Sequence, residues 1–132
     1  MLRSVPKCVL VVDDDDMIRE MIGHVLEAEG YRVETANDGQ QALAKLQTTR
    51  PDAILLDLMM PVMDGWTFLE YCRADPLCGG SPVVVMSAHP SLRERPAALG
   101  VQGVLPKPFD ICLLLDIVER LLQSPPDTTS SS

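Results

Sequence analysis

The sequence predicts an α/β fold, a three-layer sandwich in which five helices cover a five-stranded parallel sheet. Three uninterrupted apolar runs, at positions 8–12, 53–56 and 83–86, are each followed directly by a polar residue. Such runs are typical of strands that are buried on both faces of a parallel sheet. Apolar residues at helical spacing lie between the strands, and this alternation indicates a parallel sheet between two layers of helices.

The first predicted strand–helix unit begins at the apolar run 8–12, which ends at four consecutive aspartates, 13–16. Apolar residues then recur at helical spacing between residues 18 and 26. Acidic residues suit the start of this helix because they complement its dipole. Gly30 is a suitable stop. For the last two of the four aspartates we therefore expect only a solvated helix start.

The second unit combines an edge strand with a helix. Residues 31–36 alternate, with Tyr31, Val33 and Thr35 on one face and charged residues on the other, which predicts a half-exposed edge strand. Asn37-Asp38-Gly39 predicts a turn and a helix cap. The apolar residues of the helix that follows are Ala42, Leu43 and Leu46.

Two further units occupy the middle of the chain. A strand at 53–57 precedes a helix that should begin near residue 65 and end before residue 75. A strand at 82–87 precedes a helix within 88–100. Two prolines should shorten or break this fourth helix, since an interior proline costs a helix about 3 kcal/mol.

The last unit is the short strand Val104-Leu105 and a helix capped by Asp110. The predicted core side of this helix consists of Ile111, Leu114, Leu115, Val118, Leu121 and Leu122. Cys112 and Leu113 lie beyond that side, where they are either ordinary core or a partner surface.

The length of 132 residues predicts a single domain. Residues 7–123 should form this domain and residues 1–6 a lead. Residues 124–132 are rich in Pro, Ser and Thr, which predicts a disordered tail.

The composition argues against several function classes. A net charge of −8, from 11 Lys and Arg against 19 Asp and Glu, argues against a nucleic-acid or anionic-membrane surface. No apolar run approaches the ~18 residues that span a bilayer, and no signal peptide is evident. The four cysteines form no C-x-x-C pair, so we expect them to be reduced and structural in a cytoplasmic protein.

Right-handed crossovers and the edge-like second strand favour the strand order 2-1-3-4-5, a flavodoxin-like arrangement. The three most apolar strands are then central. Polar residues at the ends of four strands should meet at the carboxyl edge of the sheet, where ligands bind in such folds. These residues are Asp13, Asp14, Asp57, Ser87 and Lys107.

Three carboxylates at this edge need compensating charge, because each pair ~4 Å apart repels by roughly 4 kcal/mol at an effective dielectric of about 20. Lys107 supplies one unit, and a hard cation with oxygen ligands, Mg²⁺ above all, would supply the remainder. An Asp57 nucleophile beside Mg²⁺, a hydroxyl and a lysine predicts phosphoryl transfer. The competing interpretation is a solvated helix start with an unrelated surface lysine.

Four motifs combine along residues 7–123: Val11-Val12-Asp13-Asp14, Asp57-x-x-Met60-Pro61-x-Met63-Asp64-Gly65, Ser87-Ala88 and Lys107-Pro108-Phe109. Taken together, they resemble the response-regulator receiver domains of two-component signalling, and among these the chemotaxis regulators. The order 2-1-3-4-5 is also the order known for that family.

The resemblance implies that Asp57 accepts a phosphoryl group from the phosphohistidine of a sensor histidine kinase or a histidine phosphotransfer protein. Ser87 would donate a hydrogen bond to the phosphoryl group, and Lys107 would pair with it. The domain would catalyse only its own phosphorylation and dephosphorylation. Since nothing after residue 123 resembles a DNA-binding or enzymatic domain, the output would be a downstream protein or a missing domain, and a weak homodimer is a further expectation.

The resemblance also implies a ligand set for Mg²⁺. Asp14, Asp57 and the main-chain carbonyl of Met59 would bind the ion directly, and Asp13 would act through ordered water. One departure concerns the switch. Val104 stands where the family commonly has Tyr or Phe, so a rotating aromatic side chain cannot report phosphorylation here.

Three other functions fit the sequence less well. A haloacid-dehalogenase-type phosphatase would use Asp13 and Asp15 as its D-x-D pair, but Met17 replaces the Thr or Val expected there. A flavin carrier would need a phosphate-binding loop where this chain has four aspartates. A degenerate receiver that acts only as a docking module conflicts with the intact Asp14, Asp57 and Lys107.

Overall fold

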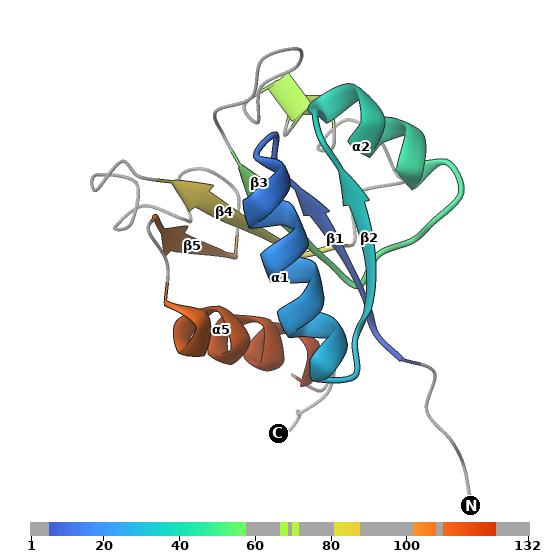
Figure 1. Cartoon of the computed structure of the whole chain (residues 1–132). Coiled ribbons are helices and arrows are strands. Elements are labelled where there is room, and N and C mark those ends of the chain that lie inside the picture. Colours follow the sequence, from blue (N-terminus) through green and yellow to red (C-terminus); the bar gives the residue numbers. More distant parts are fainter. Residues whose placement is uncertain are drawn as a thin grey trace, which may run out of the picture.

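The computed structural model describes residues 6–57, 67–68, 70–71, 81–87, 102–107 and 110–123. Within them, five parallel strands form one sheet in the order β2-β1-β3-β4-β5, which confirms the predicted fold class and strand order (Figure 1). The strands are β1 (Cys8–Val12), β2 (Arg32–Ala36), β3 (Ala53–Asp57), β4 (Val83–Ser87) and β5 (Gly103–Pro106).

The three central strands are buried along their whole length. Every residue of β1, β3 and β4 is buried, as the uninterrupted apolar runs predict, whereas β2 and β5 form the half-exposed edges. The parallel register pairs Val12 with Leu56 and Asp57 with Met86. The carboxyl ends of β1, β3 and β4 therefore lie side by side.

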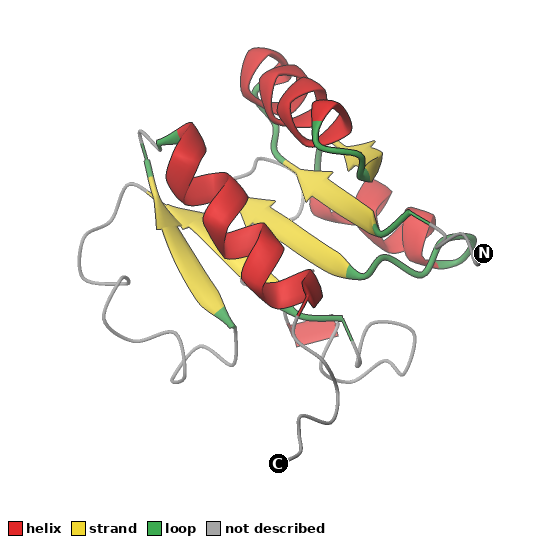
Figure 2. Cartoon of the chain, turned by 90° about the horizontal axis from the view of Figure 1, so that it is seen from below, coloured by secondary structure: helices red, strands yellow, loops and turns green. Residues whose placement is uncertain are grey.

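Helices cover both faces of the sheet. The helices α1 (Asp16–Ala28) and α5 (Ile111–Gln123) pack on one face, where Ile22 and Leu114 contact a core that includes Val11. The helix α2 (Gly39–Leu46) packs on the other face, where Ala42 and Phe68 join Leu10. Alternate residues of the same strand thus enter different core clusters, as a three-layer sandwich requires. Figure 2 shows this arrangement from below, with helices and strands coloured separately.

The predicted caps Asp38 and Asp110 and the predicted stop Gly30 are confirmed, and Asp15, expected only as part of a solvated helix start, caps α1. Oδ1 of Asp15 accepts hydrogen bonds from the backbone N–H groups of Met17 (2.9 Å) and Ile18 (3.2 Å) at the start of α1. Gly30 has a φ of 96°, a left-handed conformation that glycine adopts without steric cost, just past the end of this helix. Asp38 caps α2 by accepting from the N–H of Gln41 at 2.8 Å.

Two predicted patterns are wrong in part. On β2, Thr35 is exposed and Glu34 half-buried, because Glu34 forms an ion pair with Lys45 of α2 at 3.0 Å. On α5, Ile111 is 41% exposed, because contact with the apolar core begins one turn later, at Leu114. Cys112 and Leu113 are also exposed, so they are not core, and Cys112 is not a buried structural cysteine.

Several predictions fall largely outside the described residues. The helix expected near residues 65–75 is helical at 67–68 and 70–71, and its remainder is not described. The helix expected within 88–100, residues 1–5 and the predicted tail 124–132 are likewise not described. Among the described helices, none combines the length and the hydropathy needed to span a bilayer.

Candidate functional site

The predicted site residues stand at the carboxyl ends of adjacent strands. Asp13 directly follows β1, and its N–H donates to the carbonyl of Ala36 at 3.1 Å. Asp57 is the last residue of β3 and Ser87 the last residue of β4. Lys107 follows β5, and its N–H donates to the carbonyl of Ser87 at 2.8 Å. Sheet hydrogen bonding therefore places these polar residues at one edge.

Three carboxylates meet at this edge. One oxygen each from Asp13, Asp14 and Asp57 lies within 4.8 Å of the other two. Asp13 and Asp57 are 0% and 3% exposed, whereas Asp14 is exposed. The cluster is therefore buried on its protein side and open to solvent at Asp14. A set of carboxylate oxygens with an open side fits a hard divalent cation that keeps part of its water shell.

Both carboxylate oxygens of Asp13 are already engaged by the protein. Oδ1 accepts from the backbone N–H of Asp15 at 2.9 Å, and Oδ2 accepts from Nζ of Lys107 at 3.1 Å. Buried carboxylates need such partners because an unpaired buried charge is costly. Asp13 is consequently held in place more firmly than the exposed Asp14.

Lys107 connects the two buried acids. Its Nζ lies 3.1 Å from Oδ2 of Asp13 and 3.4 Å from Oδ2 of Asp57, and its side chain is 20% exposed. Burial disfavours the charged ammonium, but the carboxylates of Asp13 and Asp57 outweigh this effect and raise the pKa of Lys107 above its ordinary value. Lys107 therefore stays protonated and offsets part of the acidic charge.

The structure brings together Asp13, Asp14, Asp57 and Lys107. Ser87 ends the neighbouring strand β4, one residue beyond Met86, the register partner of Asp57, and is 6% exposed. Of the other residues singled out in the sequence, Met59 lies outside the described residues. Val104 is half-buried in β5 and pairs in register with Val85.

Arg19 is a site neighbour that the sequence reasoning missed. Its guanidinium donates to the backbone carbonyl of Asp13 at 2.7 Å. The sequence carries no signal for this bond, because an arginine on a polar helix face is ordinarily a solvated side chain.

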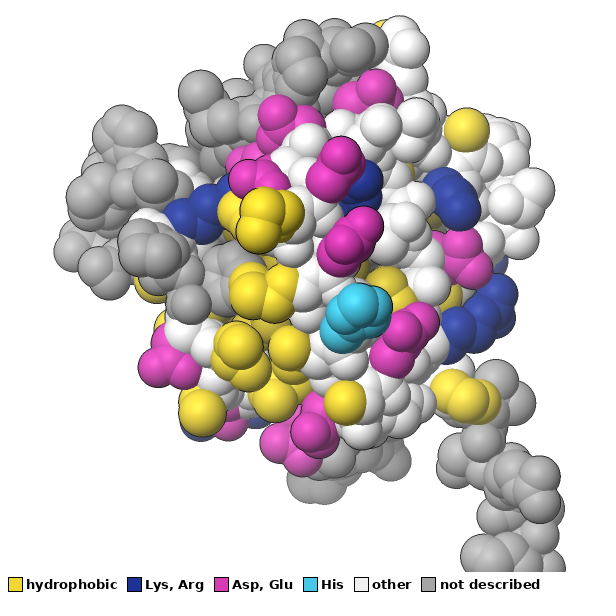
Figure 3. All heavy atoms as spheres, viewed as in Figure 1, with side chains coloured by type: hydrophobic (Ala, Val, Ile, Leu, Met, Phe, Trp, Pro, Cys, Tyr) yellow, Lys and Arg dark blue, Asp and Glu magenta, His cyan; other side chains and the backbone are white. Residues whose placement is uncertain are grey.

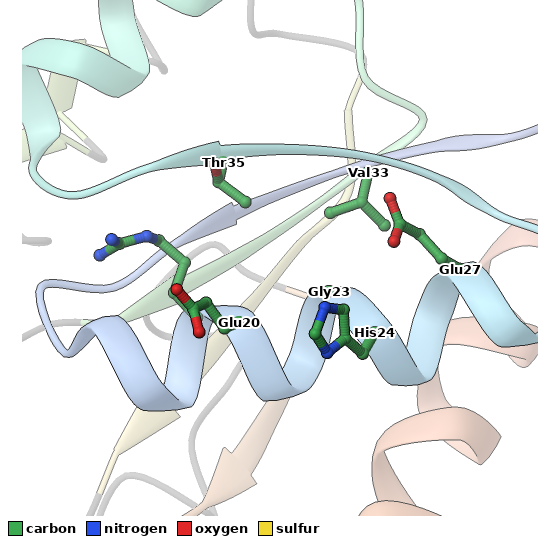
Figure 4. Close-up of a pocket in the computed structure, with 7 residues that line it drawn as sticks. Glu20, Gly23, His24, Glu27, Val33 and Thr35 are labelled. Atoms are coloured by element: carbon green, nitrogen blue, oxygen red, sulfur yellow. The ribbon is translucent and has the colours of Figure 1, made fainter.

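A groove of about 350 Å³ lies between α1 and β2, apart from the three carboxylates (Figure 4). Its walls include Glu20, His24 and Glu27 from the helix and Val33 and Thr35 from the strand. His24 is exposed, and none of the three clustered aspartates lines this groove.

Apolar side chains also reach the surface on α1 and α5. Met17 is 80% exposed and Met21 39% exposed on α1, and Leu113 is 38% exposed on α5. Figure 3 shows hydrophobic side chains alongside acidic ones on the face that carries these two helices.

Comparisons with known proteins agree on one family. A family model described as the response regulator receiver domain matches residues 9–119. The response regulator MprA of Mycobacterium leprae is 43% identical over 128 residues, covering 94% of this chain and 55% of the relative. The chain thus spans about half the length of the curated relatives it matches.

Solved structures of the same family match this chain, and the match covers the full length of two solved chains. The chemotaxis response regulator CheY4 of Vibrio cholerae shares 39% identity at a TM-score of 0.81, covering 89% of this chain and 100% of that chain. The receiver domain of the sensor histidine kinase PA1611 from Pseudomonas aeruginosa, solved with a magnesium ion coordinated in its active-site cleft, shares 31% identity at a TM-score of 0.81 and covers 91% and 100% of the two chains. This chain belongs to the response-regulator receiver domain family of two-component signalling.

Proposed function

We propose that Asp57 is the phosphoacceptor of this receiver domain and that its donor is the phosphohistidine of a sensor histidine kinase or a histidine phosphotransfer protein. The observation that carries the proposal is the buried carboxylate of Asp57 at the end of β3, within 4.8 Å of two further carboxylates and 3.4 Å from Nζ of Lys107. A nucleophilic carboxylate with a cation and a metal-binding acid pair beside it suits phosphoryl transfer.

The proposed step exchanges one bond to phosphorus for another. An oxygen of Asp57 forms a bond to the phosphorus atom, and the bond from phosphorus to the histidine nitrogen breaks, leaving its electron pair on the imidazole. The product is an aspartyl phosphate on this chain and an unphosphorylated donor. Lys107 would pair with the phosphoryl oxygens, and the hydroxyl of Ser87, at the end of the adjacent strand, would donate a hydrogen bond to one of them.

Asp14 and Asp57 are the proposed direct side-chain ligands for Mg²⁺, with the Met59 carbonyl as the third protein ligand. The engagement of both Asp13 oxygens by Asp15 and Lys107 supports a role for Asp13 through water. When bound, the ion supplies positive charge where the phosphoryl oxygens gather. Magnesium in the PA1611 receiver domain supports the choice of metal.

Phosphorylation of Asp57 would change how this domain interacts with other proteins. It would not serve the conversion of a small-molecule substrate. The family is one of signalling domains and not of conventional enzymes. Self-phosphorylation and self-dephosphorylation at Asp57 are the only reactions we propose. Because the chain spans about half of its curated relatives, the output, whether a downstream protein, another domain or a weak homodimer, stays a proposal, as does the cytoplasmic location.

The test is chemical labelling of the whole chain. Incubation with acetyl phosphate and Mg²⁺ should add one alkali-labile phosphoryl group, which intact mass and peptide mapping would place on Asp57. Asp57→Asn should remain unlabelled, and Asp52→Asn, which alters the carboxylate just before β3, should be labelled like the wild type. Equal labelling of Asp57→Asn would refute the proposal.

The labelling experiment, together with a phosphomonoester turnover assay, separates the alternatives. A docking module without phosphoryl chemistry would show no Mg²⁺-dependent label on any residue. A phosphatase with Asp13 as its nucleophile would turn over many phosphomonoesters and lose this activity in Asp13→Asn.

A further inference from the structure

The peptide units on both sides of Asp14 are held by hydrogen bonds that its own side chain does not make. The carbonyl of Asp13, in the peptide before Asp14, accepts from Nη1 of Arg19 at 2.7 Å. The N–H of Asp15, in the peptide after Asp14, donates to Oδ1 of Asp13 at 2.9 Å. Because peptide units are planar, fixing both of them fixes the direction in which the side chain between them leaves the backbone. The direction of the Cα–Cβ bond of Asp14 is thus set by Arg19 and Asp13.

Arg19 is itself held at both ends. Its backbone N–H donates to the carbonyl of Asp15 at 3.0 Å in the first turn of α1. Its second guanidinium nitrogen pairs with the carboxylate of Asp16, and its side chain is only 16% exposed. A planar guanidinium holds its donors in a fixed fork. Arg19 therefore links the end of β1 to the first turn of α1.

We infer that Arg19 is a positioning residue for the proposed Mg²⁺ site. By holding the carbonyl of Asp13, it keeps the β1–α1 connection in the conformation in which Asp14 lies within 4.8 Å of Asp13 and Asp57. The identity of the ion rests on the proposed function. The conformation of the connection does not.

Charge and position predict opposite effects of removing Arg19. A cation beside the acidic edge repels Mg²⁺, so loss of its charge alone would tighten Mg²⁺ binding. Loss of the bond to the Asp13 carbonyl would release the peptide before Asp14 and weaken binding. The direction of the change in affinity therefore decides between the two roles.

The test compares Arg19→Met with Asp16→Asn in the full chain. Methionine keeps an unbranched side chain but has neither the charge nor the donor. Titration calorimetry should give an Mg²⁺ dissociation constant about tenfold weaker for Arg19→Met, as for other residues that orient metal ligands. Asp16→Asn removes the exposed charge beside Arg19 but keeps a side-chain oxygen that can accept from its second guanidinium nitrogen, so its dissociation constant should stay within about twofold of wild type.

A second readout needs no metal. Amide hydrogen exchange at Asp15 should be faster in Arg19→Met than in wild type, while exchange at Leu10, buried in β1, should be unchanged and so report an intact fold. Unchanged or tighter Mg²⁺ binding by Arg19→Met would overturn the inference, and so would an equal weakening by Asp16→Asn.

Failure of the proposed function looks different. A wild-type chain that binds no Mg²⁺ and takes no label from acetyl phosphate would refute the phosphoacceptor assignment. The exchange rate at Asp15 would then decide by itself whether Arg19 fixes the connection.

Discussion

Nζ of Lys107 lies 3.1 Å from Oδ2 of Asp13, a residue 94 positions earlier in the chain. The same nitrogen lies 3.4 Å from Asp57. Lys107, which follows β5, is therefore a partly buried cation that links the ends of β1 and β3. Its removal should affect both the stability of the domain and the charge of the proposed site.

Lys107→Met should lower the free energy of unfolding by about 1–3 kcal/mol, because it removes the charged partner of two buried carboxylates. Urea denaturation without Mg²⁺ measures this loss. The control is Lys45→Met, which breaks the more exposed pair with Glu34 and should cost less than about 1 kcal/mol. Equal losses in the two variants would show that Lys107 is an ordinary surface lysine.

Mg²⁺ should stabilise the folded domain, because the three carboxylates converge only in the folded chain. At a concentration 100-fold above the dissociation constant, the gain should be about 2.7 kcal/mol, measured by urea denaturation with and without the ion. Asp14→Asn should remove most of this gain. Asp116→Asn, a half-exposed position on α5 paired with Arg120, should retain this gain. The same loss in both variants would argue for nonspecific binding.

The neighbouring leucines of α5 offer a matched pair. Leu114 is 1% exposed within the core, so Leu114→Ala should lower the free energy of unfolding by about 2–5 kcal/mol. Leu113 is 38% exposed, and Leu113→Ala should change the free energy of unfolding by no more than about 0.5 kcal/mol. Chemical denaturation of both variants checks the orientation of the helix. Similar losses of unfolding free energy in the two variants would mean that Leu114 does not face the core as described.

Glu34 should contribute to a pH dependence of stability. The hydrogen bond from Lys45, at 3.0 Å, is the main cause that lowers the pKa of Glu34 below its ordinary value of 4.5. A carboxyl group whose pKa is lower in the folded state stabilises that state above pH 4.5, and the effect disappears as the pH falls through the folded-state pKa.

Wild type should therefore exceed Glu34→Gln by about 0.2–1 kcal/mol in unfolding free energy at pH 7, since the pair is partly exposed. The difference should shrink as the pH is lowered through the acidic range. Urea denaturation of both proteins from pH 7 to pH 3 is the measurement. A difference that stays constant over this range would mean that the ionised carboxylate contributes nothing.

The cysteines should differ in reactivity. Cys112 is exposed, whereas Cys8 is buried, and burial raises the pKa of the Cys8 thiol. Since the thiolate is the reactive form, a maleimide should label Cys112 in the native protein well before Cys8, as followed by peptide mass spectrometry. Unfolding in urea should abolish the difference. Early labelling of Cys8 in the native state would contradict the burial of β1.

Much of the site could be predicted because its residues are tied to strand ends. An apolar run fixes where a buried strand lies, and parallel strands bring their carboxyl ends to one edge whatever the details of packing. Asp13, Asp57 and Ser87 are placed by this rule alone. The motifs around them then identified the family, which the comparisons confirmed.

Other features depend on side chains that meet across elements far apart in the sequence. Periodicity placed Ile111 in the core, but only the packing of α5 on the sheet shows that the contact begins at Leu114. Alternation placed Glu34 outside, but Lys45 of α2 holds it half-buried. The hydrogen bond from the guanidinium of Arg19 to the carbonyl of Asp13 could not be predicted from any local sequence pattern.

The sequence by itself determined the strands and the acidic edge, because hydrophobic periodicity is a local property that burial translates directly into strands and faces. The strand order rested on the handedness of the crossovers, the edge-like second strand and the family resemblance. The tertiary structure decided which partners hold each acid: Lys107 for Asp13 and Asp57, and Arg19 for the backbone beside Asp14. Such contacts depend on side-chain conformations and on the distances between packed elements, and no pattern along the chain encodes these.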